Sequence, residues 1–589
     1  MIQTRIQDNK EYKCVLILCS VIIVMVPLVN IRSFCGLSLL NDEFGYWATA
    51  GYLHGFSWED LIQLTPYYAS GYGFLLSILL WIFPQPELAY KASIVLNVVF
   101  LWISFYYLIK IGDLVFSGIK KNFRVLIATV SILMPQTLLY SQYSWPEPLL
   151  LLLYISISYS IILLVKYRST KYICGGIFAC FILTIIHPRG QFILFLYVLM
   201  AAGLSIRHRS FVNAGLVTAL GASSVIIGMM MKEWTLIHVW SFKSGYSGMN
   251  TISFDSTSIG GFINSIISHP NLFIISLMGK AEASLLTTGF VIILPIIKSI
   301  NSLKTTILNK SKNSSLDILM IWLVISFTLM MVLTSIRTLF WMERKDNLVY
   351  MRYFDFCLVP LMYIGWGLFI QMKRHKYIYL AFGLIASLIS FPYVLQKIAE
   401  IPTGFNYICS SYIGGLLLAI SDHNQLVQIV QIVQSFLLVA TLILFLDQKW
   451  KTPYIPYVWM LLYAGMNGII YFNVNNKLLE NRSADLDRIA EVVNYISNNS
   501  IHELDYLLDV KTESYPYDAK LIQFLNPELE INVITEFPKY FETKDSTVYL
   551  VNRESRKNYP ALTSENADVS TKGLFLYDFT DSKASKSKK

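Results

Sequence analysis

Apolar stretches long enough to cross a lipid bilayer recur along most of this chain. A helix needs about 17 to 25 mainly apolar residues to cross about 30 Å of hydrocarbon. We place about thirteen such spans, at 14–31, 89–111, 125–141, 147–166, 172–187, 190–206, 213–231, 283–300, 316–336, 351–371, 377–395, 425–447 and 454–473. Because 55% of the 589 residues are hydrophobic and only 14% are charged, a soluble protein could not bury them all. The sequence therefore predicts a polytopic α-helical membrane protein.

Two further apolar runs, at 71–84 and 412–420, are too short to cross the bilayer as helices. We interpret both as interfacial or re-entrant segments. Counting 71–84 as a full span would move the basic loop at 110–124, and every later basic loop, to the opposite side of the membrane.

Basic residues in the short loops predict the orientation, because Lys and Arg there stay on the cytoplasmic side. They gather in alternate loops, around residues 5–13, 110–124, 166–171, 207–209, 298–312, 373–376 and 449–451. The N-terminus is then cytoplasmic, and 32–88, 232–282, 337–350, 396–424 and the tail from 474 lie outside. The net charge of +9 comes largely from these basic loops, which would contact anionic membrane lipid. The charge therefore needs no nucleic-acid partner to explain it, and we expect none.

The composition changes near Asn473, where apolar spans give way to charged and β-rich segments. We expect a transmembrane domain over 1–473, with its larger outer loops at 32–88 and 232–282, and a small extracytoplasmic α/β domain over 474–589. An amphipathic helix is predicted at 483–500 and another helix at 518–525. Strands are predicted at 504–510, 531–535, 547–552 and 574–579. The basic tail KASKSKK is predicted to be disordered.

Several motifs of soluble and ATP-driven enzymes are missing from the chain. It has no P-loop, no GxGxxG after a strand, no HExxH and no paired CxxC. ATP-driven transport and zinc-protease chemistry therefore lose support.

Two adjacent carboxylates, Asp42 and Glu43, follow the first span directly. The structural interpretation is that Asn41 or Asp42 caps a short helix and that Glu43 favours its positive end. The functional interpretation is that a partly desolvated Asp42 accepts a proton from an attacking hydroxyl or binds a divalent cation.

Four elements together resemble the GT-C class of membrane glycosyltransferases, which includes protein O-mannosyltransferases and lipid A aminoarabinose transferases. They are the Asp42-Glu43 pair, the segment PYYASGYG at 66–73, the element WPEPL at 145–149, and Arg352-Tyr353-Phe354 heading a span that contains Pro360. The resemblance implies transfer of a sugar from a polyprenyl-phosphate or polyprenyl-diphosphate donor. The acceptor would be a hydroxyl of a cell-surface glycan, lipid or protein at the outer face of the plasma membrane. A flippase or transporter of polyprenyl-linked glycans, or a polymerase of them, is the alternative.

The resemblance also suggests roles for single residues. Asp42 would be the catalytic carboxylate, with Glu43 assisting it or holding the acceptor. Arg352, Arg344 and Lys345 cluster at the outer end of one span and would meet the donor phosphate, since an arginine can bind phosphate oxygens in a bidentate fork. The alternative is that all three are interfacial anchors whose charges reach the lipid headgroups.

Other candidates have equally plain structural explanations. Glu147 is a candidate for substrate or metal contact, but it also begins a span between two prolines, where an acid suits the helix dipole. His187 and Arg189 are candidate phosphate or metal contacts, but His187-Pro188-Arg189-Gly190 also forms a tight turn. Tyr67, Tyr68 and Tyr72 could line a sugar or lipid groove, although aromatic residues are common at membrane interfaces. Asp355 is expected to form an intrahelical ion pair with Arg352.

No spacing of acidic residues and histidines specifies a metal site. A divalent cation is therefore left open as a cofactor, with Asp42, Glu147 and His187 as the candidate ligands.

Overall fold

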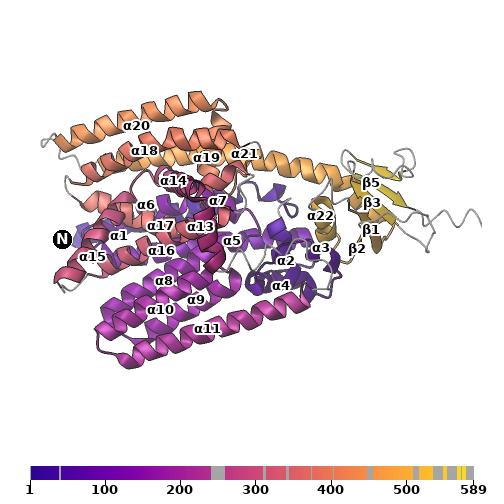
Figure 1. Ribbon diagram of the computed structural model, residues 1–589, viewed down its shortest axis with the longest axis horizontal. Coiled ribbons are helices and arrows are strands. Elements are labelled where there is room, and N and C mark those ends of the chain that lie inside the picture. The colour runs from indigo at the N-terminus through magenta and orange to yellow at the C-terminus, as the bar shows by residue number, and fades with distance from the viewer. Residues whose placement is uncertain are drawn as a thin grey trace, which may run out of the picture.

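The computed structural model describes residues 2–38, 41–240, 259–309, 314–339, 344–372, 375–401, 404–446, 455–508, 516–534, 548–552, 567–571 and 574–578. Long helices form one elongated bundle, and a small sheet lies beyond one end of it (Figure 1). Within these residues, nine helical segments are long and apolar enough to cross a membrane, or ten if one bent pair counts as a span. They identify the chain as a multi-pass membrane protein.

Most predicted spans coincide with these helices. The long ones are α1 (Ile2–Leu28), α5 (Pro86–Val115), α8 (Glu147–Tyr167), α10 (Gly190–Arg207), α11 (Phe211–His238), α16 (Ser315–Thr338), α18 (His375–Glu400), α20 (His423–Leu446) and α21 (Ile455–Asn498). The shorter apolar helices are α4 (Ser70–Ile82), α9 (Thr170–Ile186) and α17 (Asp355–Gln371). The runs at 71–84 and 412–420 correspond to α4 and to α19 (Ser411–Ala419), which are short helices of 13 and 9 residues.

The predicted number of about thirteen spans is not confirmed, and two spans differ clearly from the prediction. The span at 125–141 is bent by 66° between α6 (Lys121–Ile132) and α7 (Pro135–Ser141), because Pro135 cannot continue the preceding helix. The single span at 283–300 is wrong. It straddles the end of α14 (Pro270–Thr287) and the start of α15 (Ile293–Asn309), and Gly289 and Phe290 between them have φ of 58° and 67°.

Helix α21 passes through the predicted boundary at 473 without a break and runs for 44 residues. The predicted helix at 483–500 is therefore the end of α21 and no separate element. Beyond it lies a five-stranded sheet in the order β2-β1-β3-β5-β4. The strands are β1 (Glu503–Leu507), β2 (Glu530–Ile534), β3 (Val548–Asn552), β4 (Val569–Ser570) and β5 (Leu574–Asp578), and α22 (Tyr517–Leu525) crosses from β1 to β2.

Strand β1 pairs in parallel with β2 and β3, and β3 pairs antiparallel with β5. The predicted small α/β domain is confirmed in the described residues, whereas the predicted disordered tail lies outside them.

The small domain rests on the segment between α1 and α4, which contains α2 (Asn41–Leu53) and α3 (Glu59–Gln63) (Figure 1). Trp58 Nε1 donates to the Pro527 carbonyl at 2.9 Å, and Lys520 Nζ donates to the Leu64 carbonyl at 3.1 Å. The backbone N–H of Val533 donates to Asp60 Oδ2 at 3.0 Å. These bonds hold the sheet domain against the segment that follows the candidate acids.

The remaining described helices are short. They are α13 (Ile259–Ser268), η1 (Ile31–Ser33) and η3 (Lys345–Val349).

Candidate functional site

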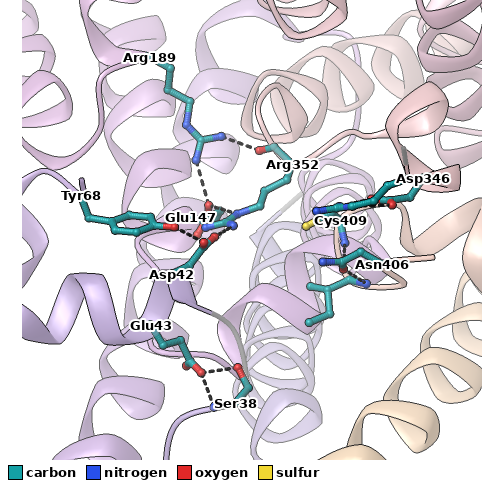
Figure 2. Close-up of polar contacts among 12 residues, drawn as sticks. Ser38, Asp42, Glu43, Tyr68, Glu147, Arg189, Asp346, Arg352, Asn406 and Cys409 are labelled. Carbon is teal, nitrogen blue, oxygen red and sulfur yellow. Dashed lines mark hydrogen bonds and ion pairs between the residues drawn. The ribbon is translucent and has the colours of Figure 1, made fainter. Parts of the chain in front are cut away.

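Asp42 lies in the first turn of α2 and has partners at both carboxylate oxygens (Figure 2). Arg352 Nη1 donates to Oδ2, and the Tyr68 hydroxyl donates to Oδ1. Gly45 permits the second contact, because a Cβ at that position would clash with the ring of Tyr68. Asp42 remains 25% exposed while its arginine is only 4% exposed. The carboxylate is therefore held in place but still reachable from solvent.

The Tyr68 phenol is a hydrogen-bond donor at any ordinary pH. Burial, followed by the charge of Asp42 and the hydrogen bond to it, raises the pKa of Tyr68 well above its usual value.

Removing the hydroxyl in Tyr68→Phe leaves Asp42 with one partner. We expect kcat of any reaction in which Asp42 takes up a proton to fall about tenfold, since one charged hydrogen bond contributes about 1.5 kcal/mol. Tyr67→Phe, which leaves Asp42 untouched, is the matched control in a steady-state assay, and equal kcat values for the two variants would contradict this role.

Arg352 links Asp42 to a second acid. Its Nε donates to Glu147 Oε1 at 2.6 Å, and its guanidinium lies 3.7 Å from the centroid of the Trp145 ring. Arg189 completes the group, because its Nη2 donates to the same Glu147 oxygen at 2.9 Å and its Nη1 donates to the Arg352 carbonyl at 2.6 Å. Two carboxylates and two guanidiniums thus form one buried, charge-balanced network (Figure 2).

This network lies where the N-terminal ends of four helices meet. Asp42 is in the first turn of α2, Glu147 begins α8, Arg189 is the N-cap of α10, and Arg352 stands three residues before the start of α17. Helix N-termini carry partial positive charge and unpaired N–H groups. Together with two arginines, they make this end of the bundle suited to an anionic group.

His187 supports the turn between α9 and α10 and does not bond to either acid. Its Nδ1 accepts from the backbone N–H of Arg189 at 3.2 Å. Burial and then the charges of Arg189, Arg352 and Arg337 lower the pKa of His187 well below its usual value. The imidazole is therefore neutral at pH 7 and acts here as an acceptor that orients Arg189.

Glu43 points away from Asp42 and belongs to a different set of contacts (Figure 2). It is fully buried and accepts four hydrogen bonds. Ser38 donates from N and Oγ at 2.6 and 2.5 Å, and Tyr90 and the Ser144 N–H each donate at 2.7 Å. A carboxylate with four donors fixes backbone segments and has little capacity left to hold an acceptor.

The other predicted binding residues lie outside the network. Arg344 forms a bidentate pair with buried Asp346 at 3.0 and 2.5 Å, and Lys345 is half-buried beside it in η3. Tyr72 donates to Asn97 Oδ1 at 3.1 Å, and the ring of Tyr67 packs against Trp240 with centroids 5.4 Å apart. Of the three tyrosines, only Tyr68 bonds to an acid of the network.

The expected ion pair between Arg352 and Asp355 is wrong. Asp355 is the first residue of α17, and its Oδ2 instead accepts from the Tyr140 hydroxyl at 2.6 Å. The turn before α17 aims Arg352 across the bundle at Asp42 and Glu147, whereas an i, i+3 pair requires one continuous helix. Asp355 and Glu147 line a small cavity with Tyr140, Thr137 and Arg352.

Sequence reasoning gave no role to Tyr140 or Trp145. The sequence around Tyr140 does not indicate a role for it, because this side chain faces the cavity only as a result of the bend before α7. Trp145 stood in the quoted WPEPL element, and a tryptophan beside an acid could have suggested a stacking platform for an arginine.

The donor set does not fit a divalent cation. Both oxygens of Asp42 are engaged by Arg352 and Tyr68, and Glu147 is bonded by two arginines. Among the described residues, no three His, Cys, Asp or Glu side chains are grouped so that they could hold a metal ion.

No protein-family model and no curated protein matches the chain. Solved structures do match. ArnT from Cupriavidus metallidurans bound to undecaprenyl phosphate, a lipid A aminoarabinose transferase, has a TM-score of 0.51 at 11% identity over 95% of this chain and 97% of its own. Its apo state gives the same values. The archaeal oligosaccharyltransferase AglB from Archaeoglobus fulgidus, in complex with an inhibitory peptide and a dolichol-phosphate, has a TM-score of 0.39 at 12% identity and covers 72% of this chain and 60% of its own. The chain therefore has the fold of the GT-C class, as the sequence motifs predicted.

Proposed function

We propose that this protein is a glycosyltransferase that moves a sugar from a polyprenyl-phosphate or polyprenyl-diphosphate donor to a hydroxyl of a cell-surface glycan, lipid or protein. One observation carries the proposal. A partly accessible carboxylate, Asp42, pairs with buried Arg352, and Arg352 shares Glu147 with a second buried arginine, Arg189, at one end of a helical bundle. The chain shares its fold with ArnT, whose structure was solved with undecaprenyl phosphate bound.

The donor's phosphate would bind at the arginines. Arg352 and Arg189 are both bonded to carboxylates in this structure, so an incoming phosphate would compete with Asp42 for the Nη1 group of Arg352. Phosphate oxygens suit this site because guanidinium donors and four helix N-termini converge there. The polyprenyl tail would lie along the apolar helices in the bilayer. Arg344 and Lys345 are not assigned this role, because they lie outside the network that joins Arg352, Arg189 and the two acids.

Release of Asp42 from Arg352 would give the site its base. The acceptor oxygen forms a bond to the anomeric carbon, the bond from that carbon to the phosphate oxygen breaks, and the acceptor proton passes to Asp42. Such displacements pass through an oxocarbenium-like state. The charge left on the phosphate is then met by Arg352 and Arg189, which stand fixed before the reaction begins. Tyr68 keeps the carboxylate oriented through Oδ1.

Glu147 would orient the arginines and contact the donor sugar. Its Oε1 is shared between Arg189 and Arg352, whereas its Oε2 has no hydrogen-bond partner among the described residues. A buried acceptor without a donor suits a sugar hydroxyl or a bound water. No observation favours the transporter alternative, because the charged groups of the site form ion pairs at the ends of helices.

The site would face the outer side of the plasma membrane, with the N-terminus cytoplasmic and the sheet domain outside. Three basic clusters support this orientation, because those at 166–171, 207–209 and 373–376 come at the C-terminal ends of α8, α10 and α17, whose N-terminal ends meet at the site.

Binding and transfer are tested separately. The purified protein is reconstituted in nanodiscs and titrated with undecaprenyl phosphate and undecaprenyl diphosphate, with thermal stabilisation as the signal. Transfer is then followed with radiolabelled sugar on the same carriers, using surface material of the source cell as acceptor. We expect stabilisation by at least one carrier and movement of label from lipid to acceptor. Failure of both carriers to bind would contradict the proposal.

A further inference from the structure

Besides the two arginines of the candidate site, a third buried arginine lies on the helix that leads into the sheet domain. Arg482 belongs to α21 and is only 6% exposed. Its guanidinium lies 4.1 Å from the ring centroid of Tyr143 and 4.7 Å from that of Phe34. Neither ring carries a charge, so the compensating carboxylate must be found elsewhere.

That carboxylate is Glu43, which Arg482 reaches through a single hydroxyl. Arg482 Nη2 donates to the Tyr90 oxygen at 2.9 Å, and the Tyr90 hydroxyl donates to Glu43 Oε1 at 2.7 Å. Glu43 forms no direct ion pair among the residues that the structure describes. A fully buried carboxylate needs such compensation, because the interior solvates an isolated charge poorly.

The same guanidinium also holds the segment that leads to Glu147. Arg482 Nη2 donates to the Gln142 carbonyl at 3.1 Å, and the N–H of Ser144, two residues later, donates to Glu43 Oε1 at 2.7 Å. Trp145, which supports Arg352, follows directly. Arg482 therefore contacts two segments of the site. It reaches Glu43, next to Asp42, through Tyr90, and it bonds directly to the segment that precedes Glu147.

The sheet domain holds the first of these segments from its other side. Phe524 of α22 packs against Trp47 of α2 with centroids 5.1 Å apart and against Tyr90 with centroids 6.2 Å apart. Asp60 and Trp58, just after α2, bond to the domain's backbone. Helix α21 joins the two attachments, since it carries Arg482 and continues into the domain (Figure 1).

We infer that Arg482 is a positioning residue that sets the place of Asp42 through Tyr90 and Glu43, and that α21 thereby couples the C-terminal domain to the site. This inference rests on the proposed function. A displacement of about 1 Å at a reacting group can lower a rate about 100-fold. Loss of the link should therefore change kcat and leave donor binding intact, because Arg352 and Arg189 are untouched.

The decisive variants are Tyr90→Phe, Arg482→Lys and Arg482→Ala. Tyr90→Phe removes only the bridging hydroxyl and is expected to lower kcat about tenfold, with KM for the lipid-linked donor within about twofold. Arg482→Ala should lower kcat further, and Arg482→Lys should recover part of the loss because an ammonium can still donate to Tyr90. The double variant Arg482→Ala with Tyr90→Phe should lose less than the product of the two single losses, since both residues act on Glu43 through the Tyr90 hydroxyl.

Lys477→Ala is the matched control, because it removes a cation from the same helix whose ion pair is with exposed Glu480. Hydrogen exchange over residues 41–53 gives a readout that does not depend on activity. Exchange there should be faster in Tyr90→Phe and Arg482→Ala and unchanged in Lys477→Ala.

The outcomes separate the two proposals. If the wild-type protein transfers no sugar, the proposed function fails, and hydrogen exchange still decides whether Arg482 holds α2. If the wild-type protein is active but Tyr90→Phe and Arg482→Lys keep its kcat and its exchange rates, the inference is overturned and the function stands. A raised KM with unchanged kcat would also overturn the inference. Should Arg482→Ala fail to fold, the two milder variants decide.

Discussion

Asp42→Asn is expected to lower sugar transfer about 1,000-fold and to leave the protein folded and inserted. The amide has nearly the same shape as the carboxylate but cannot accept the acceptor's proton, and general-base catalysis contributes about 10² to 10⁴ in rate. The fold should persist because Arg352 keeps its ion pair with Glu147 at 2.6 Å. The measurement is kcat in nanodiscs with a radiolabelled lipid-linked donor, beside size-exclusion profiles and melting temperatures.

Glu87→Gln provides the control for this substitution. It changes an acid in the first turn of α5 into an amide, but this acid is exposed and its ion pair is the surface one with Lys91. Such surface pairs contribute about 0 to 1 kcal/mol, so activity and stability should both remain near wild type. Retained transfer by Asp42→Asn, in protein that melts like the wild type, would remove Asp42 from the role of base.

The sequence predicts helices well in this protein because their physical signal is local. Long apolar runs match α8, α16 and α18 within a few residues, since no other element satisfies its backbone within lipid. The failures come from breaks inside apolar runs. The turn at Gly289 and Phe290 is as apolar as its flanking helices, so composition alone could not separate α14 from α15.

The candidate site was predicted only in part because its contacts are long-range. Asp42 and Arg352 were named as candidates, yet 310 positions separate them, and only the fold brings them together. Arg189 was named from a turn, and its place beside Glu147 depends on how α8, α9 and α10 pack. Glu43 shows the reverse case, because adjacency to Asp42 suggested a shared role, whereas successive positions of a helix point in different directions. The link through Arg482 crosses 439 positions and had no local signal at all.

Arg352→Ala is expected to abolish donor binding and also to destabilise the protein by about 3 kcal/mol, the lower end of the range for a broken buried ion pair. The lower end applies because Glu147 keeps Arg189 at 2.9 Å, so that Asp42 alone is left without a cation. Removing that orphaned charge as well, in Asp42→Asn with Arg352→Ala, should therefore restore part of the stability without restoring transfer.

Arg352→Lys keeps the charge but loses the bidentate contact and the stacking on Trp145, so it should bind undecaprenyl phosphate at least about tenfold more weakly. Denaturant titrations in mixed micelles and carrier titrations in nanodiscs measure the two effects. Normal carrier binding by Arg352→Ala would refute the assigned phosphate site, and a double variant less stable than Arg352→Ala would show that Asp42 is not the charge left unpaired.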